Sequence, residues 1–362
     1  MKKLKIAVYA ICKNEEKFAK RWYESMKEAD EIYVTDTGST DNTVETLKSL
    51  GVKVAVADIT PWRFDLARNI SLEKVPDDVD ICVCTDLDEY FKKGWREALE
   101  NAWTKGVTTR ARYKYTWSFN DDNTPAVTFW YEKIHARHGF QWTHPVHEIL
   151  EFDHSVPDIY TTAYGVELEH HPDNQKSREQ YLELLELSVK ENPDDDRNVH
   201  YLGREYMFRG KWDESIQTLQ KHLALPNAKW LDERSASMRY IARCYIEKND
   251  LKNAEIWFYR AIAEAPHLRE GYVELAKLFY KEDNWSGVYH MIQEALKIKE
   301  RPETYINEGF CWDYTIYDLI SIAAYNMGIY VKSLEYARKA LSMNPNDKRL
   351  QNNVEIIKEA VF

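Results

Sequence analysis

The chain has 362 residues, of which 44% are hydrophobic, and a formal net charge of −11. This length suffices for two domains, because a domain usually takes about 150 residues. The negative charge argues against a protein that coats nucleic acid or anchors on an anionic membrane, since both depend on clusters of Lys and Arg. No apolar run approaches the ~20 residues of a membrane-spanning helix.

The segment Met1–Lys5 leads directly into a short predicted strand, without the apolar core and cleavage site of a signal peptide. The cysteines are scattered, and the two that share a predicted strand, Cys82 and Cys84, do not have the spacing of a zinc knuckle. We therefore expect reduced thiols and a cytoplasmic protein.

Residues 1–172 alternate short β-rich runs with helical patterns, which predicts βαβ units on a mainly parallel sheet. The expected strands are residues 5–10, 31–36, 52–56 and 79–85, and the expected helices are residues 16–27, 43–50, 65–72 and 95–105. Farther on, aromatic and β-branched segments such as Arg112–Trp117 predict antiparallel strands added to this sheet. The expected fold of this part is an α/β domain with a mixed, Rossmann-like sheet.

From residue 177 onward the sequence pattern is helical, and it repeats. A small residue in a first helix recurs in four copies, each followed by a turn and a second helix; these residues are Gly203, Ala242, Ala276 and Ser321. Small residues let paired helices approach, and a period of about 34 residues is that of a tetratricopeptide repeat. We expect a linker helix at residues 173–196, an all-α repeat solenoid at residues 197–347 and a capping helix at residues 348–362.

The segment Asp86-Leu87-Asp88-Glu89 follows an apolar run that predicts a buried parallel strand. Open α/β sheets bind their ligands beyond the carboxyl ends of the strands. Two carboxylates at that edge suit a divalent cation that neutralises a diphosphate leaving group. Asp86 and Asp88 are therefore candidate metal ligands, and solvated acids at a strand end are the alternative interpretation.

Two earlier strand ends carry candidate nucleotide-binding residues. The loop after the first strand can offer backbone groups to a planar base, which makes Ala10, Cys12, Asn14 and Glu15 candidates, although helix capping explains Asn14 equally well. The second strand ends at Asp36, and the residues after it account for the turn and the helix cap. Asp36 is thus left without a structural role, and its carboxylate can accept a hydrogen bond from the imide nitrogen of uracil.

Cations follow in the next elements. Arg68, on the third predicted helix, could reach the nucleotide or a phosphate, and a surface position is the alternative. Lys133, Arg137 and His138 could oppose a diphosphate. Four tryptophans are candidate platforms for a sugar or a base, with core packing as the alternative: Trp62, Trp117, Trp130 and Trp142.

Two histidine-containing pairs close this part of the chain. Activation of an acceptor hydroxyl requires a carboxylate or an imidazole, so Glu148 is the candidate general base. Alternatively, Glu148 orients the acceptor, and His147 or Glu89 takes the proton. His170, in preference to His171, is the candidate third metal ligand. Two carboxylates, one imidazole and phosphate oxygens suit Mn²⁺ or Mg²⁺, and the nitrogen ligand favours Mn²⁺.

Together these motifs resemble a family 2 glycosyltransferase with the GT-A fold. The resemblance rests on Lys13–Glu16, Asp36–Thr43, Asp86–Glu89 and His147-Glu148, in that order. With the appended repeats, the chain is similar to the tetratricopeptide-containing subgroup that includes the S-glycosyltransferases of glycocin bacteriocins.

This resemblance implies a UDP-sugar donor, a divalent metal and inversion at the anomeric carbon. It implies that Asp36 contacts uracil, that Asp86 lies at the ribose and the metal-bound region, and that Asp88 and His170 bind the metal. Glu148 lies near the position of the family's acidic base, but this chain has His-Glu there instead of the commoner Glu-Asp pair.

The expected function is transfer of the sugar to a peptide, a protein side chain or a glycan that the repeats recruit. A thiol acceptor would need less activation than a hydroxyl, because its pKa lies nearer neutrality. The charge balance disfavours a nucleic-acid acceptor, and a homodimer is compatible with the repeats.

Two other functions are alternatives to a glycosyltransferase. A non-catalytic repeat scaffold with a degenerate nucleotide-binding domain is one alternative, against which the intact acidic motifs speak. A sugar nucleotidyltransferase is the other, but its loop rich in glycine and lysine is missing.

Overall fold

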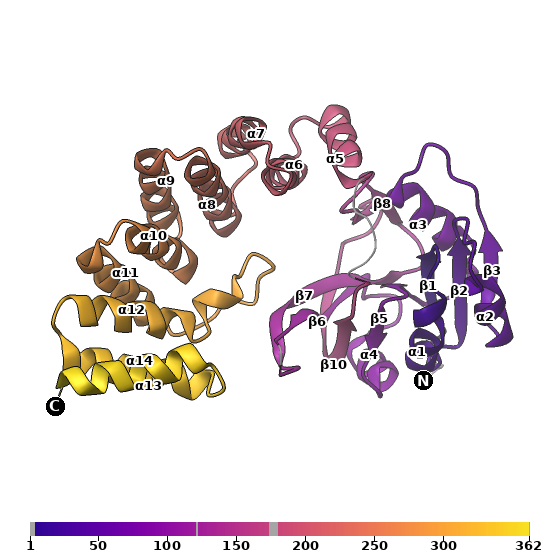
Figure 1. Ribbon diagram of the computed structural model, residues 1–362. Helices are drawn as coiled ribbons and strands as arrows, with labels where there is room; N and C mark the ends of the chain where they lie inside the picture. Colours follow the sequence, from indigo (N-terminus) through magenta and orange to yellow (C-terminus); the bar gives the residue numbers. More distant parts are fainter. Residues whose placement is uncertain (1–3, 121, 174–179, 362) are drawn as a thin grey trace. The chain divides into compact units, whose positions relative to one another are not determined.

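The computed structural model describes residues 4–120, 122–173 and 180–361, and the chain divides into two compact units, residues 1–188 and 189–362 (Figure 1). Residues 174–179 of the predicted linker helix and residue 362 of the predicted capping helix lie outside the described residues. The five cysteines are buried, and they are unpaired, in agreement with the expected reduced thiols. Every helix in the described ranges is too short or too polar to cross a bilayer.

A mixed sheet forms the first unit, with the strand order β3-β2-β1-β4-β7-β6-β10-β5. Its strands are β1 (Ile6–Cys12), β2 (Glu31–Asp36), β3 (Lys53–Val56), β4 (Ile81–Asp86), β5 (Glu89–Phe91), β6 (Arg110–Phe119), β7 (Pro125–Ala136) and β10 (Tyr160–His170). Strands β1 to β4 are parallel, whereas β7 runs antiparallel to β4 and β6. A separate hairpin pairs β8 (Phe140–Thr143) with β9 (Ile149–Phe152). The α/β class and the mixed GT-A type of sheet are confirmed.

Helices cover both faces of this sheet because successive side chains of a strand point to opposite sides. Ile6 and Val8 of β1 pack with α1 (Glu16–Met26), α2 (Thr43–Ser49) and α4 (Trp95–Ala102). Ala7 and Tyr9 pack on the other side with α3 (Phe64–Glu73) and the β8–β9 hairpin. The carboxyl ends of β1, β2 and β4 therefore meet at one edge, between two packed layers. The unit also includes most of α5 (Gln180–Glu191).

The second unit consists of helix pairs, which confirms the all-α repeats (Figure 1). The pairs are α6 (Asp196–Phe208) with α7 (Trp212–Ala224), α8 (Leu231–Glu247) with α9 (Leu251–Glu264), α10 (Arg269–Lys281) with α11 (Trp285–Lys297), and α12 (Thr315–Asn326) with α13 (Tyr330–Met343). A short 3₁₀ turn, η1 (Gly309–Cys311), precedes α12, and α14 (Lys348–Val361) follows the last pair.

Small residues make the close contacts within the pairs. The hydroxyl of Ser215 donates to the carbonyl of Gly203 at 2.8 Å, and Ser333 bonds to the carbonyl of Ser321 in the same way at 2.8 Å. A Cβ atom on Gly203 would lie 2.5 Å from side-chain atoms of Leu219. Close helix contact is thus the physical reason for the small-residue repeat.

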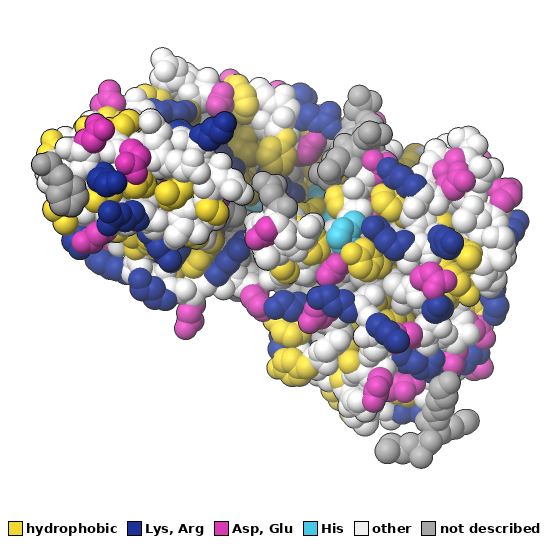
Figure 2. All heavy atoms as spheres, turned by 60° about the horizontal axis from the view of Figure 1, so that its bottom comes forward, with side chains coloured by type: hydrophobic (Ala, Val, Ile, Leu, Met, Phe, Trp, Pro, Cys, Tyr) yellow, Lys and Arg dark blue, Asp and Glu magenta, His cyan; other side chains and the backbone are white. Residues whose placement is uncertain are grey.

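Charges of both signs are intermingled over the described residues of the face seen in Figure 2. The observation agrees with the net charge of −11.

Gly203→Ala is expected to destabilise the helical unit by about 1–3 kcal/mol, because the added methyl group overpacks the contact with Leu219. Urea unfolding followed by circular dichroism measures the change. Gly309→Ala is the matched control, since a Cβ atom there meets nothing within 4 Å. Equal stability of the two variants would contradict the close-contact role of Gly203.

Candidate functional site

A buried guanidinium joins three segments at the carboxyl edge of the sheet. Arg68 of α3 is 5% exposed, and its Nη2 atom lies 2.9 and 3.1 Å from the carboxylate oxygens of Asp86 at the end of β4. Its Nε atom donates to Glu148, which precedes β9. The candidate base and the first acid of the Asp-x-Asp motif therefore share one side chain. Arg68 is buried, which corrects the alternative of a surface position, and its predicted contact with a nucleotide or a phosphate would compete with these two ion pairs.

A second buried cation completes the network on the other side of Asp86. The Nζ atom of Lys133, on β7, lies 3.0 Å from Asp86 and 3.3 Å from Glu89. Burial alone would raise the pKa of Asp86, but Arg68 and Lys133 hold it well below its ordinary value of 3.8. The hydroxyl of Tyr115 donates to Glu89 at 2.7 Å. Lys133 is thus paired with carboxylates, and the approach to a diphosphate that was predicted for it would compete with these ion pairs.

Glu89 has a structural role in the same network. It is 2% exposed, and one of its carboxylate oxygens accepts the backbone amide of Asp86 at 2.9 Å. Burial raises the pKa of Glu89, against the effect of Lys133. A buried carboxylate with these partners does not fit the proton acceptor that was considered as an alternative to Glu148.

The segment before Glu148 is anchored by backbone contacts to α3. The side chain of Asn69 donates to the carbonyl of Trp142 at 2.8 Å and accepts its amide at 2.9 Å. The amide of Phe64 donates to the carbonyl of Pro145 at 2.9 Å. His147 adopts a φ of +53°, in the left-handed region that side chains rarely occupy. Such strain persists only where surrounding contacts hold the chain, and these contacts fix the position of Glu148.

Asp88 and His170 approach each other beside this network. The Nε2 atom of His170, the last residue of β10, lies 3.4 Å from Oδ2 of Asp88. Its Nδ1 atom bonds to the carbonyl oxygen of Trp117 at 3.2 Å, and the indole of Trp117 stacks on the imidazole at 4.4 Å between ring centroids. A carbonyl oxygen can only accept, so Nδ1 carries the hydrogen and Nε2 faces Asp88. Burial would lower the pKa of His170, but the nearby Asp88 carboxylate outweighs it and raises that pKa.

Asp88 and His170 fit a divalent metal. Their facing atoms are separated by 3.4 Å, close to the spacing of about 3 Å between neighbouring ligands on bonds of ~2.1 Å. An imidazole that donates its other nitrogen to a backbone carbonyl is the usual arrangement at metal sites. Asp86 fits less well, because Arg68 and Lys133 already occupy its carboxylate. The residues thus favour a ligand pair of Asp88 and His170 over the predicted set of three.

Asp36 has a structural role, contrary to the prediction from sequence. It is 1% exposed, and its Oδ1 accepts the amides of Gly38 and Ser39, both at 3.0 Å. Its other oxygen accepts the hydroxyl of Ser39, and the thiol of Cys12 lies 3.4 Å away. Gly38 has a φ of +100°, so the tight turn after β2 requires this glycine. A uracil contact through Asp36 would compete with these hydrogen bonds.

The loops after β1 and β2 are joined to each other. The side-chain oxygen of Asn14 accepts the backbone amide of Thr40 at 2.7 Å, and the backbone amide of Asn14 donates to the hydroxyl of Ser39 at 2.8 Å. The amide of Glu15 donates to the hydroxyl of Thr43 at 2.7 Å. Asn14 therefore links two loops and does not cap α1, whose N-cap residue is Glu15.

Three further residues were predicted to contact the donor, namely Ala10, Cys12 and Arg137. The carbonyls of Ala10 and Cys12 already accept hydrogen bonds, at 2.8 Å from Ser71 and 2.9 Å from Thr37. Arg137 bonds to the carbonyl of Val75, at the opposite edge of the sheet, because its neighbour on β7 pairs with the first residue of β4. The structure therefore does not bring Arg137 to the site.

The surroundings of the remaining histidine and tryptophan candidates differ from one residue to the next. The ring of His147 lies edge-on to that of Tyr181 at 6.0 Å. The imidazole of His171 lies 3.2 Å from Glu169 and is stacked on Tyr90. Of the four tryptophans, Trp142 is buried and donates to Tyr9, whereas Trp117 is 43% exposed.

Sequence reasoning missed the ion pairs of Lys133 and the roles of Tyr115 and Trp117. Alternation along β6 predicts that Tyr113 and Tyr115 face one side, and both are buried. The partners of these side chains depend on the neighbours of β6, which local patterns do not specify.

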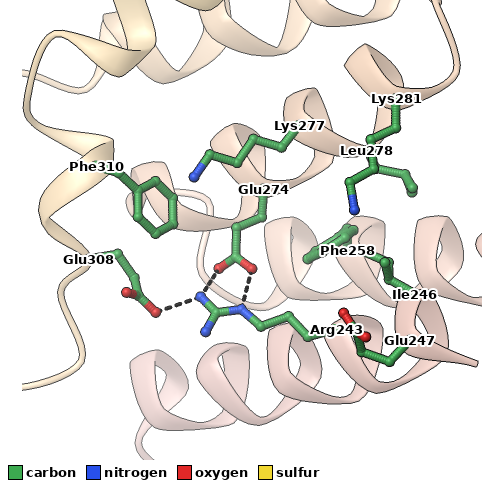
Figure 3. A pocket seen from close by; sticks show the side chains of 10 residues that line it. All are labelled: Arg243, Ile246, Glu247, Phe258, Glu274, Lys277, Leu278, Lys281, Glu308 and Phe310. Atoms are coloured by element: carbon green, nitrogen blue, oxygen red, sulfur yellow. Dashed lines mark hydrogen bonds and ion pairs between the residues drawn. The ribbon is translucent and has the colours of Figure 1, made fainter.

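The helical unit contains a pocket of about 340 Å³, formed by α8, α9, α10 and the segment around η1. Figure 3 shows Arg243 held between Glu274 and Glu308, at 2.6 and 2.5 Å. Lys277 lies over the ring of Phe310, with its Nζ atom 3.2 Å from the ring centroid. The pocket therefore combines acidic, basic and aromatic groups.

Residues 7–151 match the family described as Glycosyl transferase family 2. This segment contains the edge residues Arg68, Asp86, Asp88 and Glu148, and the match supports a glycosyltransferase at the level of this family, with a nucleotide-sugar donor and an acceptor. No curated protein shows significant sequence similarity to the chain.

Several solved structures are similar to part of the chain. A crystal structure of MamA is 17% identical and covers 45% of this chain and 86% of its own, with a TM-score of 0.37. The Pseudomonas aeruginosa protein pilF is 13% identical, with coverages of 47% and 70% and a TM-score of 0.38. The C-terminal part of a TPR repeat-containing protein from Cytophaga hutchinsonii is 18% identical, with coverages of 50% and 65% and a TM-score of 0.40. The repeat architecture described above rests on the helix pairs themselves.

Arg68→Met is expected to lower the free energy of unfolding by about 3 kcal/mol at pH 7, because Glu148 and Asp86 lose a buried partner. Because the pKa of Asp86 is lowered from its ordinary value of 3.8, its ionised form stabilises the folded protein at pH values above 3.8. This contribution is lost progressively as the pH falls below 3.8. The difference between the two proteins should therefore shrink from pH 7 to pH 3, as urea unfolding measures. Arg112→Met is the control, because this arginine lies on an exposed part of β6, where its Nε atom donates to the hydroxyl of Thr162. A difference that stays constant with pH would contradict the role of the ion pair.

Proposed function

We propose that the chain transfers a sugar from a UDP-sugar to an acceptor, with inversion at the anomeric carbon and with the help of Mn²⁺ or Mg²⁺. The observation that carries this proposal is the approach of Asp88 to His170, 3.4 Å apart, beside the shared ion pairs of Arg68 with Asp86 and Glu148. The family match over residues 7–151 supports the reaction class.

Asp88 and His170 are the residues that would hold the metal. When bound there, a divalent ion supplies positive charge to the diphosphate as the bond to the sugar breaks. The hydrogen bond from His170 Nδ1 to Trp117 keeps the Nε2 lone pair directed at the ion. Asp86, held by two cations, would act by position, as an acceptor for ribose hydroxyls.

Glu148 would accept the proton of the attacking group. The acceptor oxygen or sulfur forms a bond to the anomeric carbon, the bond from that carbon to the diphosphate oxygen breaks, and the nucleoside diphosphate leaves with the electron pair. Arg68 orients the carboxylate of Glu148 and links it to Asp86, so the base and the donor end of the site are positioned by one side chain.

The acceptor would be a polypeptide that the helical unit recruits. The pocket around Arg243, Lys277 and Phe310 supports this, because acidic, basic and aromatic groups together suit the mixed side chains of a peptide. A peptide cysteine, a hydroxyl side chain and a glycan all have a nucleophile that Glu148 could serve. The resemblance to the glycocin S-glycosyltransferases that the sequence motifs suggest makes a peptide thiol the first acceptor to examine.

Asp88→Ala should reduce Mn²⁺-dependent hydrolysis or transfer from a panel of UDP-sugars at least about 100-fold, because it removes a proposed metal ligand. The fold should persist, since the carbonyl of Asp88 still accepts the amide of His171. Glu167→Ala, a charge removed from the exposed surface of the same β10 strand as His170, serves as the control. Undiminished turnover in Asp88→Ala would refute the metal assignment.

Glu148→Gln should lower the rate of transfer by about 10²–10⁴-fold while leaving UDP binding intact, because Gln still accepts from Arg68 but cannot take a proton. The assay follows the glycosylated acceptor by mass spectrometry. Glu151→Gln, on the exposed side of β9, should transfer at the normal rate. If Glu148→Gln keeps full activity, the base is another group, and His147→Gln tests the remaining alternative.

A further inference from the structure

A cluster of two histidines and one glutamate lies inside the helical unit. His200 on α6, His222 on α7 and Glu233 on α8 are 0%, 0% and 4% exposed. One potential ligand atom from each residue lies within 4.8 Å of the other two. Three successive helices thus contribute one side chain each to a single buried point.

Neighbouring hydroxyl groups bond to the Nδ1 atoms of both histidines and to one carboxylate oxygen of Glu233. The Oγ atom of Ser237 lies 2.7 Å from Nδ1 of His200 and 2.9 Å from Nδ1 of His222. The hydroxyl of Tyr305 donates to one carboxylate oxygen of Glu233. A hydroxyl oxygen can accept two hydrogen bonds, so Ser237 can hold both imidazoles with hydrogen on Nδ1. Both Nε2 atoms then present lone pairs.

The Nε2 atoms of the two histidines, which face the centre of the cluster, lack hydrogen-bond partners within the described residues. Both atoms are buried. Nε2 of His222 lies 3.5 Å from Oε1 of Glu233, which is long for a hydrogen bond. It matches the edge of about 3.3 Å in a tetrahedral zinc site with bonds of ~2.0–2.1 Å. Buried imidazole nitrogens without partners are rare, and they call for an explanation.

The chemistry of the donor set points to a transition metal. An imidazole that binds a metal must be neutral, and the position of Ser237 allows both rings to carry their hydrogen on Nδ1. Two imidazoles and one carboxylate are a donor set that suits Zn²⁺, whereas Mg²⁺ and Ca²⁺ prefer oxygen alone. Ser237 and Tyr305 have the positions of the outer hydrogen-bond partners that orient ligands at such sites.

We propose that His200, His222 and Glu233 bind Zn²⁺ or a similar divalent transition-metal ion, and that this ion ties α6, α7 and α8 together. The site is separate from the Asp88–His170 pair and does not depend on the proposed sugar transfer. Its effect is on the stability of the first two helix pairs.

Zinc content tests the proposal on the full-length protein carrying Asp88→Asn, so that the proposed donor site does not contribute. After saturation with Zn²⁺ and dialysis, mass spectrometry of the metal should give about one equivalent per chain. In the same background, His222→Gln and Glu233→Gln should each contain at most about one tenth as much zinc per chain. His267→Gln is the matched control, because this histidine is half-exposed and pairs with Asp232 outside the cluster. Retention of the zinc in both cluster variants would overturn the proposal.

A second measurement uses the unaltered cluster, in case the variants fold poorly. Zn²⁺ should raise the melting temperature of the Asp88→Asn protein by about 5 °C or more, and a chelator should reverse the shift. Co²⁺ should give the visible absorption of a four- or five-coordinate site. A chain with no stoichiometric zinc and no change of melting temperature would show that the five side chains form a metal-free hydrogen-bond network, contrary to the proposal.

Discussion

The site depends on the neutralisation of one buried positive charge, that of Arg68. An unpaired buried charge costs several kcal/mol, so the fold is stable only where carboxylates reach this guanidinium. Asp86 and Glu148 provide them, from the end of β4 and from the segment before β9. These ion pairs connect α3, the sheet edge and the segment before β9, which the contacts of Asn69 and Phe64 also anchor to α3. They also fix the position of Asp88, which follows Asp86 by two residues.

The two acids of the Asp-x-Asp motif have different surroundings, and this difference divides their roles. Asp86 lies between Arg68 and Lys133, and its charge is compensated within the protein. Asp88 faces His170, whose imidazole is oriented by Trp117. The first acid therefore organises the edge, and the second is the one suited to a metal. The Asp-x-Asp motif suggests two equivalent ligands. The two acids differ because neighbouring elements give Asp86 two cationic partners and place a histidine beside Asp88.

Periodicity and turn chemistry predicted the elements well, because these signals are local. The strand Glu31–Asp36 was predicted with its observed bounds, and the helix expected at residues 95–105 ends at Ala102 because Trp103 is extended. The small residues Gly203 and Ser321 indicated the helix pairs for the physical reason found in the structure.

The partners of buried polar groups were not predictable in this way. The role of Asp36 depends on the amides of its own turn, and that of Arg68 depends on a hairpin 80 residues later. Arg137 was assigned to the site because it precedes Glu148 in sequence, whereas the antiparallel direction of β7 carries it to the opposite edge. The cluster of His200, His222 and Glu233 likewise requires three helices to meet, and no short motif announces it.

The central claim is that the carboxyl edge of the sheet binds a nucleotide through a metal held by Asp88 and His170. Isothermal titration of the protein with UDP, with and without Mn²⁺, tests it most directly. The account predicts clear binding of UDP with Mn²⁺ and at least ten-fold weaker binding without it. Equal affinity under both conditions, or no binding in either, would contradict it.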